Sequence, residues 1–479
     1  MAWGLLPSLA ACSSSRTIVA TGTDGASGQE AGATAPTAPF TGCDDGRRAM
    51  VSGGSSASGG SSDAPRVCSI ETGITTPFDA TLVVDPSGAL LLSPASGISR
   101  SHDNGTTWET LDPTAGMATL AGRIHPWIFR DAKTGRVFFN AYDPTGDPTC
   151  PALGGPDCMV GAVGCSKDAG TAIWSTDDFG NTWQRSVAGC DDSKDYGKVF
   201  SGPATTASSK SRLAAGGYAN MVYFCAEGPN YITGPNRQCY RSFDGGKTYA
   251  RTASDAVDKA GRGDLGFPLA GAVAPDGSIY VTHSSTTDMR LGLSVSHDEG
   301  DSWSEVFVPG STFTSANLLV FLSMAVTTDL DGNVYVSWSD EADLLPYVVA
   351  SKDGGATWTP KLDLSPPGVA VGIMPNLTAD RAGYVAVAYY GSADAKGNGG
   401  DGYLASDGRE YDAYLTVVSD VFAGNPTLTT GKVNTGDPVI DGESFAVSEY
   451  LGPPVFGPDG SIWAAYVNKG QGLVARIIP

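Results

Sequence analysis

One short pattern recurs five times through the middle of this chain of 479 residues, and it constrains the fold more than any other feature. The shared skeleton is Ser-x-Asp-x-Gly-x-(Thr/Ser)-aromatic, and we place one inserted residue in the second copy. The aspartates of the five copies are Asp103, Asp177, Asp244, Asp298 and Asp353, which puts 54 to 74 residues between neighbouring copies. A unit of this length that repeats along a chain predicts a repeat architecture.

Each copy has the residues of a tight turn between two β-strands. A short Asp side chain accepts hydrogen bonds from backbone N–H groups a few residues further on. The Gly supplies a backbone conformation with positive φ, which other residues reach only with strain. The aromatic residue starts the next strand and buries apolar surface beside the turn. A turn explains every fixed position, so we interpret the five aspartates as structural and not catalytic.

A second pattern, an Asp- and Gly-containing turn followed by a strand, precedes several copies, for example at residues 273–281 and 328–336. Each unit then contains four short antiparallel strands, which is the blade of a β-propeller. We place the blades at about residues 74–112, 122–187, 197–252, 265–307, 318–362, 372–431 and 443–479.

The last of these blades shows three strands, and residues 67–70 can supply its fourth. Pairing the two ends of the domain in one blade leaves no open seam in the ring. The sequence therefore predicts an all-β fold of seven blades closed by an N-terminal strand, with six blades as the alternative.

The repeated pattern resembles the Asp-box, also called the bacterial neuraminidase repeat. Over residues 66–479 the chain resembles the sialidase-like β-propeller superfamily, in particular its secreted bacterial members. The resemblance implies that the Asp-boxes lie on the outer rim, away from the central site. It leaves the activity open, because Asp-boxes also occur in propellers that only bind.

The catalytic machinery that this resemblance implies is incomplete in the sequence. A sialidase needs three arginines around the substrate carboxylate, together with a Tyr–Glu pair and a separate Asp. The segment at residues 76–82 lacks the Phe-Arg-Ile-Pro motif that carries the first arginine, and after Arg290 only Arg381, Arg409 and Arg476 remain. A glycoside hydrolase would have to recruit residues from the set Arg123, Asp264, Glu449 and Tyr450.

A binding site is the other interpretation of the channel mouth. His125 and Trp127 lie at the start of blade two, where an aromatic ring and an imidazole suit sugar stacking and hydrogen bonding. The structural alternative is that Trp127 packs between blades and that His125 is a polar residue whose hydrogen-bonding groups have partners within the protein. Our leading hypothesis is a propeller that binds extracellular glycan or protein at this mouth. The alternatives are an exo-α-sialidase-like hydrolase and an envelope interaction scaffold with no small ligand.

The net charge of the chain narrows the classes of molecule that it can bind. With 51 acidic and 30 basic residues the formal net charge is −21, which would repel nucleic acid and anionic membranes. No cofactor is expected, and the scattered His and the lack of Cys-x-x-Cys spacing argue against a metal site.

Apart from Cys12 there are eight cysteines, an even number that suggests disulfides. Neighbouring pairs such as Cys165–Cys190 and Cys225–Cys239 are candidates among 105 possible pairings.

The N-terminal region differs in composition from the rest. Residues 1–12 end in Leu-Ala-Ala-Cys and resemble a bacterial signal with a lipobox, which would make Cys12 a lipidation site. Residues 13–65 are rich in Ser, Gly and Ala, and we interpret them as a disordered linker. The predicted location is extracellular or on the cell envelope, with membrane contact only through a lipid anchor at Cys12.

Overall fold

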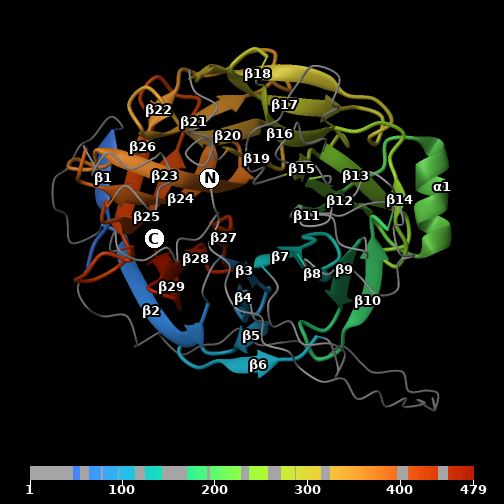
Figure 1. Cartoon of the computed structure of the whole chain (residues 1–479), viewed down its shortest axis with the longest axis horizontal. Helices are drawn as coiled ribbons and strands as arrows, with labels where there is room; N and C mark the ends of the chain where they lie inside the picture. Colours follow the sequence, from blue (N-terminus) through green and yellow to red (C-terminus); the bar gives the residue numbers. More distant parts are fainter. Residues whose placement is uncertain are drawn as a thin grey trace, which may run out of the picture.

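The computed structural model describes residues 47–53, 64–76, 79–94, 97–113, 124–142, 170–190, 195–227, 237–256, 271–285, 287–313, 324–395, 408–440 and 451–478. Within these ranges the chain forms seven antiparallel sheets that stand in a ring around a central axis (Figure 1). The protein is therefore a seven-bladed β-propeller, as the sequence predicts, and the six-bladed alternative is wrong.

In six of the blades the four strands follow one another in sequence order from the axis to the rim (Figure 1). The strands of blades one to three are β3 (Ala80–Val84), β4 (Leu90–Pro94), β5 (Ile98–Ser101), β6 (Glu109–Leu111), β7 (Ile124–Arg130), β8 (Val137–Tyr142), β9 (Thr171–Thr176), β10 (Gln184–Ala188), β11 (Asp195–Gly202), β12 (Met221–Glu227), β13 (Arg237–Ser242) and β14 (Ala250–Arg251).

Blades four to six continue the same pattern, and a short helix, α1 (Ala207–Gly216), joins β11 to β12 at the outer edge of blade three. The strands of blades four to six are β15 (Gly271–Val273), β16 (Ile279–Ser285), β17 (Arg290–Ser296), β18 (Ser304–Thr312), β19 (Met324–Thr328), β20 (Val334–Ser339), β21 (Pro346–Ser351), β22 (Leu362–Asp363), β23 (Val371–Arg381), β24 (Tyr384–Ser392), β25 (Asp412–Ser419) and β26 (Thr427–Lys432).

The middle strands of the blades are apolar on both faces, because each blade packs between two neighbours. All six residues of β20 (sequence VYVSWS) are buried, and so are eight of the nine residues of β24. Such β-branched and aromatic residues suit a pleated surface that is covered on both sides. The core of the molecule is therefore the series of seams between blades, arranged around the axis.

Blade seven closes the ring with strands from both ends of the domain. It contains β27 (Val455–Phe456), β28 (Ile462–Asn468) and β29 (Gln471–Ile478), and β2 (Arg66–Thr75) forms its outermost strand. Cys68 lies opposite Arg476 in this pairing. The closing strand expected at residues 67–70 is thus confirmed and is longer than expected.

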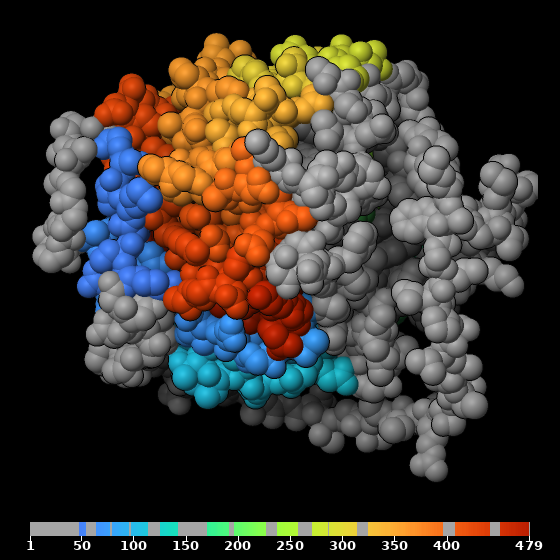
Figure 2. All heavy atoms as spheres, turned by 60° about the vertical axis from the view of Figure 1, so that its left-hand side comes forward, coloured from blue at the N-terminus to red at the C-terminus, as the bar shows by residue number. Residues whose placement is uncertain are grey.

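A second N-terminal strand corrects the predicted extent of the linker. β1 (Met50–Gly53) pairs with β26 and gives blade six a fifth strand at the rim. In Figure 2 the blue N-terminal strands lie directly against the orange and red blades six and seven. Residues 47–53 therefore belong to the propeller, whereas the sequence predicts a disordered linker over residues 13–65.

The five repeated acidic turns share one set of hydrogen bonds. In the first copy the Ser101 hydroxyl donates to Asp103 and accepts from the backbone N of Gly105, each at 2.8 Å. The Asp103 carboxylate also accepts from the backbone N of Thr107 at 2.8 Å and from its hydroxyl at 2.7 Å. Gly105 has a φ of 84°, which fits the requirement for Gly at this position.

The second copy corrects the sequence alignment. Here the contacts fall on Asp178, which accepts from the backbone N of Thr182 at 2.8 Å and from the hydroxyl of Thr176 at 2.7 Å. The hydroxyl of Thr176 replaces that of a Ser, so this copy starts one residue later and has no insertion. Asp177, the residue expected to form the turn, instead pairs with Arg136 at 2.5 Å.

The other three copies keep the expected residues. Asp244, Asp298 and Asp353 each accept hydrogen bonds from the backbone N and hydroxyl of the residue four positions on. In the last copy, hydrogen bonds from Thr357 and from Ser351 hold the pKa of Asp353 below its ordinary value. Each turn joins the outer two strands of a different blade, so the aspartates do not share one cavity.

A disulfide joins the two middle strands of blade three. Cys225 of β12 lies directly opposite Cys239 of β13, and their sulfur atoms are bonded at 2.03 Å. This neighbouring pair is one of the two proposed from the sequence and is confirmed. Cys68 and Cys190 are also disulfide-bonded. The second proposed pair, Cys165–Cys190, includes a residue outside the described ranges.

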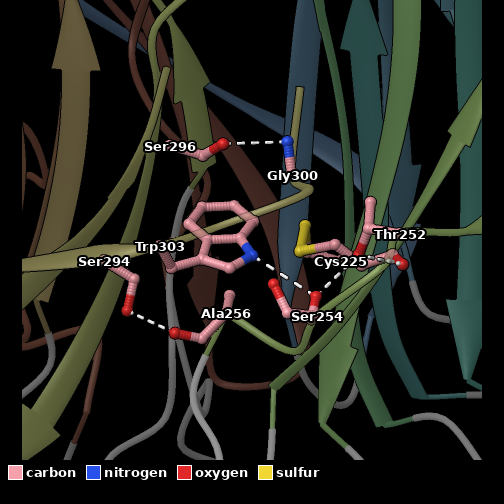
Figure 3. Close-up of a disulfide and its surroundings, with 9 residues drawn as sticks. Cys225, Thr252, Ser254, Ala256, Ser294, Ser296, Gly300 and Trp303 are labelled. Atoms are coloured by element: carbon pink, nitrogen blue, oxygen red, sulfur yellow. Dashed lines mark hydrogen bonds between the residues drawn. A yellow bond between two sulfur atoms is a disulfide. The ribbon is translucent and has the colours of Figure 1, made fainter. Parts of the chain in front are cut away.

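The chain after β14 lies between the disulfide and blade four (Figure 3). The backbone N of Thr252 donates to the carbonyl oxygen of Cys239 at 3.0 Å. From the other side, the Trp303 indole donates to Ser254 O at 3.3 Å, and the Ser294 hydroxyl donates to Ala256 O at 2.6 Å. Blades three and four are therefore joined through the backbone of this short segment.

Candidate functional site

The axis of the ring contains a cavity of about 280 Å³. It is lined by the first strands of five blades, β3, β7, β19, β23 and β27, together with Gly271 of β15. Most of the lining side chains are apolar, for example Leu82, Ile128 and Val326. We call the end of the channel where the first strands begin the entry end, and the end where they finish the exit end.

At the entry end, three consecutive blades bring one residue each into contact. Nδ1 of His125, on β7, lies 3.1 Å from Oδ2 of Asp79, the residue directly before β3. The His125 ring stacks on Tyr196 of β11, with ring centroids 4.0 Å apart and an angle of 27° between the planes. All three side chains are buried, so the ring geometry of the blades, and not a local loop, assembles this group.

Trp127 of β7 and Lys198 of β11 lie two residues further along the same strands as His125 and Tyr196. The Trp127 indole donates to Val199 O at 2.9 Å, which joins blade two to blade three. Nζ of Lys198 lies 4.6 Å from the centroid of the Trp127 ring, close enough for a cation–π interaction. We call the five residues Asp79, His125, Trp127, Tyr196 and Lys198 the His125 cluster.

Two residues of the cluster and one residue of blade six have a strained backbone at equivalent positions in the first strands of their blades. His125, Tyr196 and Met374 have φ values of 54°, 47° and 55°, in the left-handed region. Each lies at an irregularity in the pairing of the first strand of its blade. A left-handed conformation costs a residue other than Gly about 1–2 kcal/mol. Irregularities of this kind re-aim side chains and are common beside functional sites.

The burial of His125 and Trp127 limits what they can do directly. Their exposed fractions are 3% and 5%, and Trp127 packs between blades two and three, as the structural alternative predicts. Trp127 nevertheless also lines the axial cavity. Direct contact of either side chain with a ligand therefore stays a prediction, whereas a role in holding the walls of the entry end follows from their contacts.

Four candidate residues from the sequence lie outside the described ranges. These are Arg123, Asp264, Glu449 and Tyr450, and the same is true of the lipidation candidate Cys12. Arg123 is the residue directly before β7, and Tyr450 is the residue directly before Leu451. Their proposed roles stay predictions.

Asp79, Tyr196 and Lys198 were missed by sequence reasoning. Tyr196 is the second residue of β11, just as His125 is the second residue of β7. Aligning the starts of the first strands by their blades would have shown that these positions lie side by side at one end of the channel. In the described part of the chain no group of three or more His, Cys, Asp or Glu side chains is arranged to hold a metal ion. Nor does any described helix have the length and apolar character needed to cross a membrane.

Comparison with known proteins gives a partial sequence match and several structural ones. No family model matches the chain. Over 210 residues the chain is 27% identical to a xyloglucanase from a Paenibacillus species. The match covers 40% of this chain and 18% of the xyloglucanase, so the chain spans less than a fifth of the length of that relative.

Three of the structural matches, each under 15% identical to this chain, illustrate how distant they are. The NanB sialidase of Streptococcus pneumoniae has a TM-score of 0.42 and 14% identity, over 67% of this chain and 66% of that one. An α-L-arabinanase of Penicillium chrysogenum has a TM-score of 0.40 and 13% identity, over 74% and 93%. The Aleuria aurantia lectin has a TM-score of 0.40 and 11% identity, over 76% and 99%. At these scores we draw no conclusion about function from the structural matches.

Proposed function

We propose that this protein is an exported propeller that binds an extracellular glycan at the entry end of its channel. The observation that carries the proposal is the His125 cluster. A carboxylate, an imidazole, two aromatic rings and an ammonium group converge there from three blades. Binding sites for sugars combine apolar rings with a few fixed polar groups in this way.

The strain at the entry end supports a role beyond packing. A ring of blades can close without left-handed residues in its first strands, yet His125 and Tyr196 both adopt this conformation where they stack. Local strain of about 1–3 kcal/mol per residue persists only where the surroundings impose it, and such residues are concentrated at ligand-binding and active sites. The stacked pair therefore fixes the shape of the channel wall at this end.

The partial match to a xyloglucanase suggests the class of glycan to test first. The match covers only 18% of the xyloglucanase, so activity on xyloglucan is a proposal for this chain. A neutral polysaccharide would also suit a chain with a net charge of −21, since it would not be repelled.

Hydrolysis is the second candidate function, favoured by the same match and by the contact between Asp79 and His125. A glycoside hydrolase of the usual type needs two carboxyl groups on opposite sides of the scissile bond. In the His125 cluster, as far as the chain is described, Asp79 supplies the carboxylate and its side chain is fully buried. Binding is therefore the better supported proposal.

Export is the remaining part of the proposal. The Cys225–Cys239 bridge and the bonded state of Cys68 and Cys190 suit an oxidising compartment. Lipid anchoring at Cys12 is proposed on the sequence alone. Labelling of the expressed protein with a fatty-acid analogue tests it, and a Cys12→Ser variant should lose the label.

An array of immobilised polysaccharides tests the function. We expect the purified protein to be retained on xyloglucan or a related neutral glucan. Failure to bind any member of a broad panel of neutral and acidic glycans would favour the interaction scaffold with no small ligand. In parallel, incubation with xyloglucan and with a fluorogenic sialoside, followed by assay of released sugar, tests hydrolysis. Steady release by the wild-type protein would make the hydrolase the correct interpretation.

A further inference from the structure

The exit end of the channel has a cavity that the proposed function does not use. Its volume is about 480 Å³, within the range of small-molecule sites. Four blades form its walls. They contribute the β3–β4 turn, the end of β7, the β23–β24 turn and the β27–β28 turn. Its polar lining side chains are Asp85, Arg130, Asp380, Arg381 and Tyr384, and Phe456 adds a second aromatic ring.

Arg130 is the notable group in this cavity. It is half-buried at the end of β7, and among the described residues its guanidinium has neither a hydrogen-bond partner nor an ion pair within 4 Å. Burial lowers the pKa of this guanidinium, and the charges of Asp85 and Asp131 only partly oppose the effect. Removing part of the hydration of an unpaired charge is unfavourable. A bound anion would relieve that cost.

Two further groups have free bonding capacity toward the cavity. Oδ1 of Asp85 accepts three hydrogen bonds within its own turn, from Ser87 and Ala89, whereas no described residue donates to its Oδ2. The Tyr384 hydroxyl likewise has no partner among the described residues. Both are therefore available to the hydroxyl groups of a ligand.

Arg381 and the aromatic rings complete the site. The Arg381 guanidinium lies 3.8 Å from the centroid of the Tyr384 ring and is 3.1 Å from Asp380. The Tyr384 and Phe456 rings are 5.7 Å apart, at 36° to each other. A pyranose ring can place its apolar C–H face against such rings, while the planar fork of an arginine matches a carboxylate.

We propose that the exit end is a second binding site, specific for a sugar unit that carries a carboxylate, such as a hexuronate. Arg130 binds the carboxylate, Tyr384 and Phe456 face the sugar ring, and Oδ2 of Asp85 accepts from a hydroxyl group. The site is independent of the His125 cluster, which lies at the other end of the channel.

Titration of the full-length protein with methyl glucuronoside, followed by saturation-transfer NMR, tests this site. We expect saturable binding that weakens at least tenfold when the carboxylate of the same sugar is converted to its neutral methyl ester. Methyl glucoside should bind as weakly as the ester. Equal binding of acid and ester, or absence of saturable binding of the acid, would overturn the proposal.

Substitutions locate the site. Arg130→Gln should weaken glucuronoside binding at least tenfold, and Arg381→Gln, at an exposed position that folding tolerates, should weaken it at least threefold. Arg212→Gln is the matched control, because this exposed arginine lies on α1 at the outer edge of blade three, and it should bind like the wild type. Wild-type affinity in both Arg130→Gln and Arg381→Gln would overturn the assignment, as would equal weakening by Arg212→Gln.

Discussion

The guanidinium of Arg241 in blade three donates a hydrogen bond of 2.9 Å to the backbone oxygen of Glu299 in blade four. The carboxylate of the same Glu299 reaches back and accepts from the backbone N of Thr205 and Thr206, at 2.8 and 3.0 Å. Thr205 and Thr206 directly precede α1. The first backbone N–H groups of a helix have no partner within the helix. Both the backbone oxygen and the carboxylate of Glu299 therefore accept hydrogen bonds from blade three, and the acidic turn of blade four joins the two blades.

Two other acidic turns are joined to the preceding blade in a similar way. Arg100 of blade one donates to Phe179 O in the turn of blade two at 3.0 Å. Arg136 of blade two donates to Gly245 O in the turn of blade three at 2.7 Å. The turns thus connect neighbouring blades around the rim, which is a structural task and agrees with the interpretation made from the sequence.

Glu299 gives the first prediction. Burial alone would raise its pKa, but hydrogen bonds from Ser209, Thr206 and Thr205 outweigh burial and lower the pKa from its ordinary value of 4.5. Glu299→Gln should reduce the free energy of unfolding at pH 7 by about 1–3 kcal/mol, because bonds to a charged acceptor are lost. Urea denaturation of both proteins measures the difference.

The pH dependence of that difference has a defined sign. A carboxyl group with a depressed pKa in the folded state stabilises the protein above its unfolded pKa and loses this effect as the pH falls through the folded value. The gap between wild type and Glu299→Gln should therefore narrow below about pH 4.5. A gap that stays constant down to pH 3 would contradict the role of the ionised carboxylate.

The corrected second turn gives a matched pair of variants. Asp178→Ala removes the acceptor for Thr182 and Thr176, and we expect a loss of about 1–2 kcal/mol in the free energy of unfolding. Asp177→Ala removes an ion pair between the exposed carboxylate of Asp177 and the buried guanidinium of Arg136. Arg136 keeps its hydrogen bond to Gly245 O, so we expect a loss of no more than about 1 kcal/mol. If Asp177→Ala proved the more destabilising in urea titrations, the assignment of the turn to Asp178 would be wrong.

The disulfide of blade three gives the third prediction. Its cysteines are 14 residues apart, and closing a loop of that length stabilises a protein by about 3 kcal/mol in the chain-entropy model. The double variant Cys225→Ala/Cys239→Ala should therefore unfold at a lower denaturant concentration under oxidising conditions. An unchanged midpoint would show that the bridge does not contribute to stability.

The strand that closes the ring can be tested against the extra strand beside it. Val67 of β2 is 2% exposed, whereas Val51 of β1 is 39% exposed. Val67→Asp places a charge in the seam between blades six and seven and should cost about 3 kcal/mol or more. Val51→Asp should change stability by no more than about 0.5 kcal/mol. Similar thermal denaturation of the two variants would argue against closure by β2.

The sequence predicts the fold well because its signals are local. Turn residues such as Asp103 and Gly105 specify where two strands meet, and five such turns with regular spacing fix the number and limits of most blades. The second turn was misaligned because Ser175 and Asp177 fit the pattern almost as well as Thr176 and Asp178. Only the hydrogen bonds distinguish the two alignments.

The site and β1 could not be predicted in the same way, because their contacts are distant in sequence. Met50 pairs with Thr430, and nothing in the short segment around Met50 indicates that partner. Asp79, His125 and Tyr196 meet only because three successive blades stand side by side around one axis. Cluster residues of this kind become visible when the starts of the first strands are aligned with one another.

Isothermal titration with a xyloglucan oligosaccharide most directly tests glycan binding at the entry end. We predict saturable binding by the wild type and at least tenfold weaker binding by His125→Asn, since Asn tolerates the left-handed backbone but lacks the ring that stacks on Tyr196. His102→Asn, on the exposed first acidic turn, should bind like the wild type. No saturable binding, or equal affinity in all three proteins, would contradict the account.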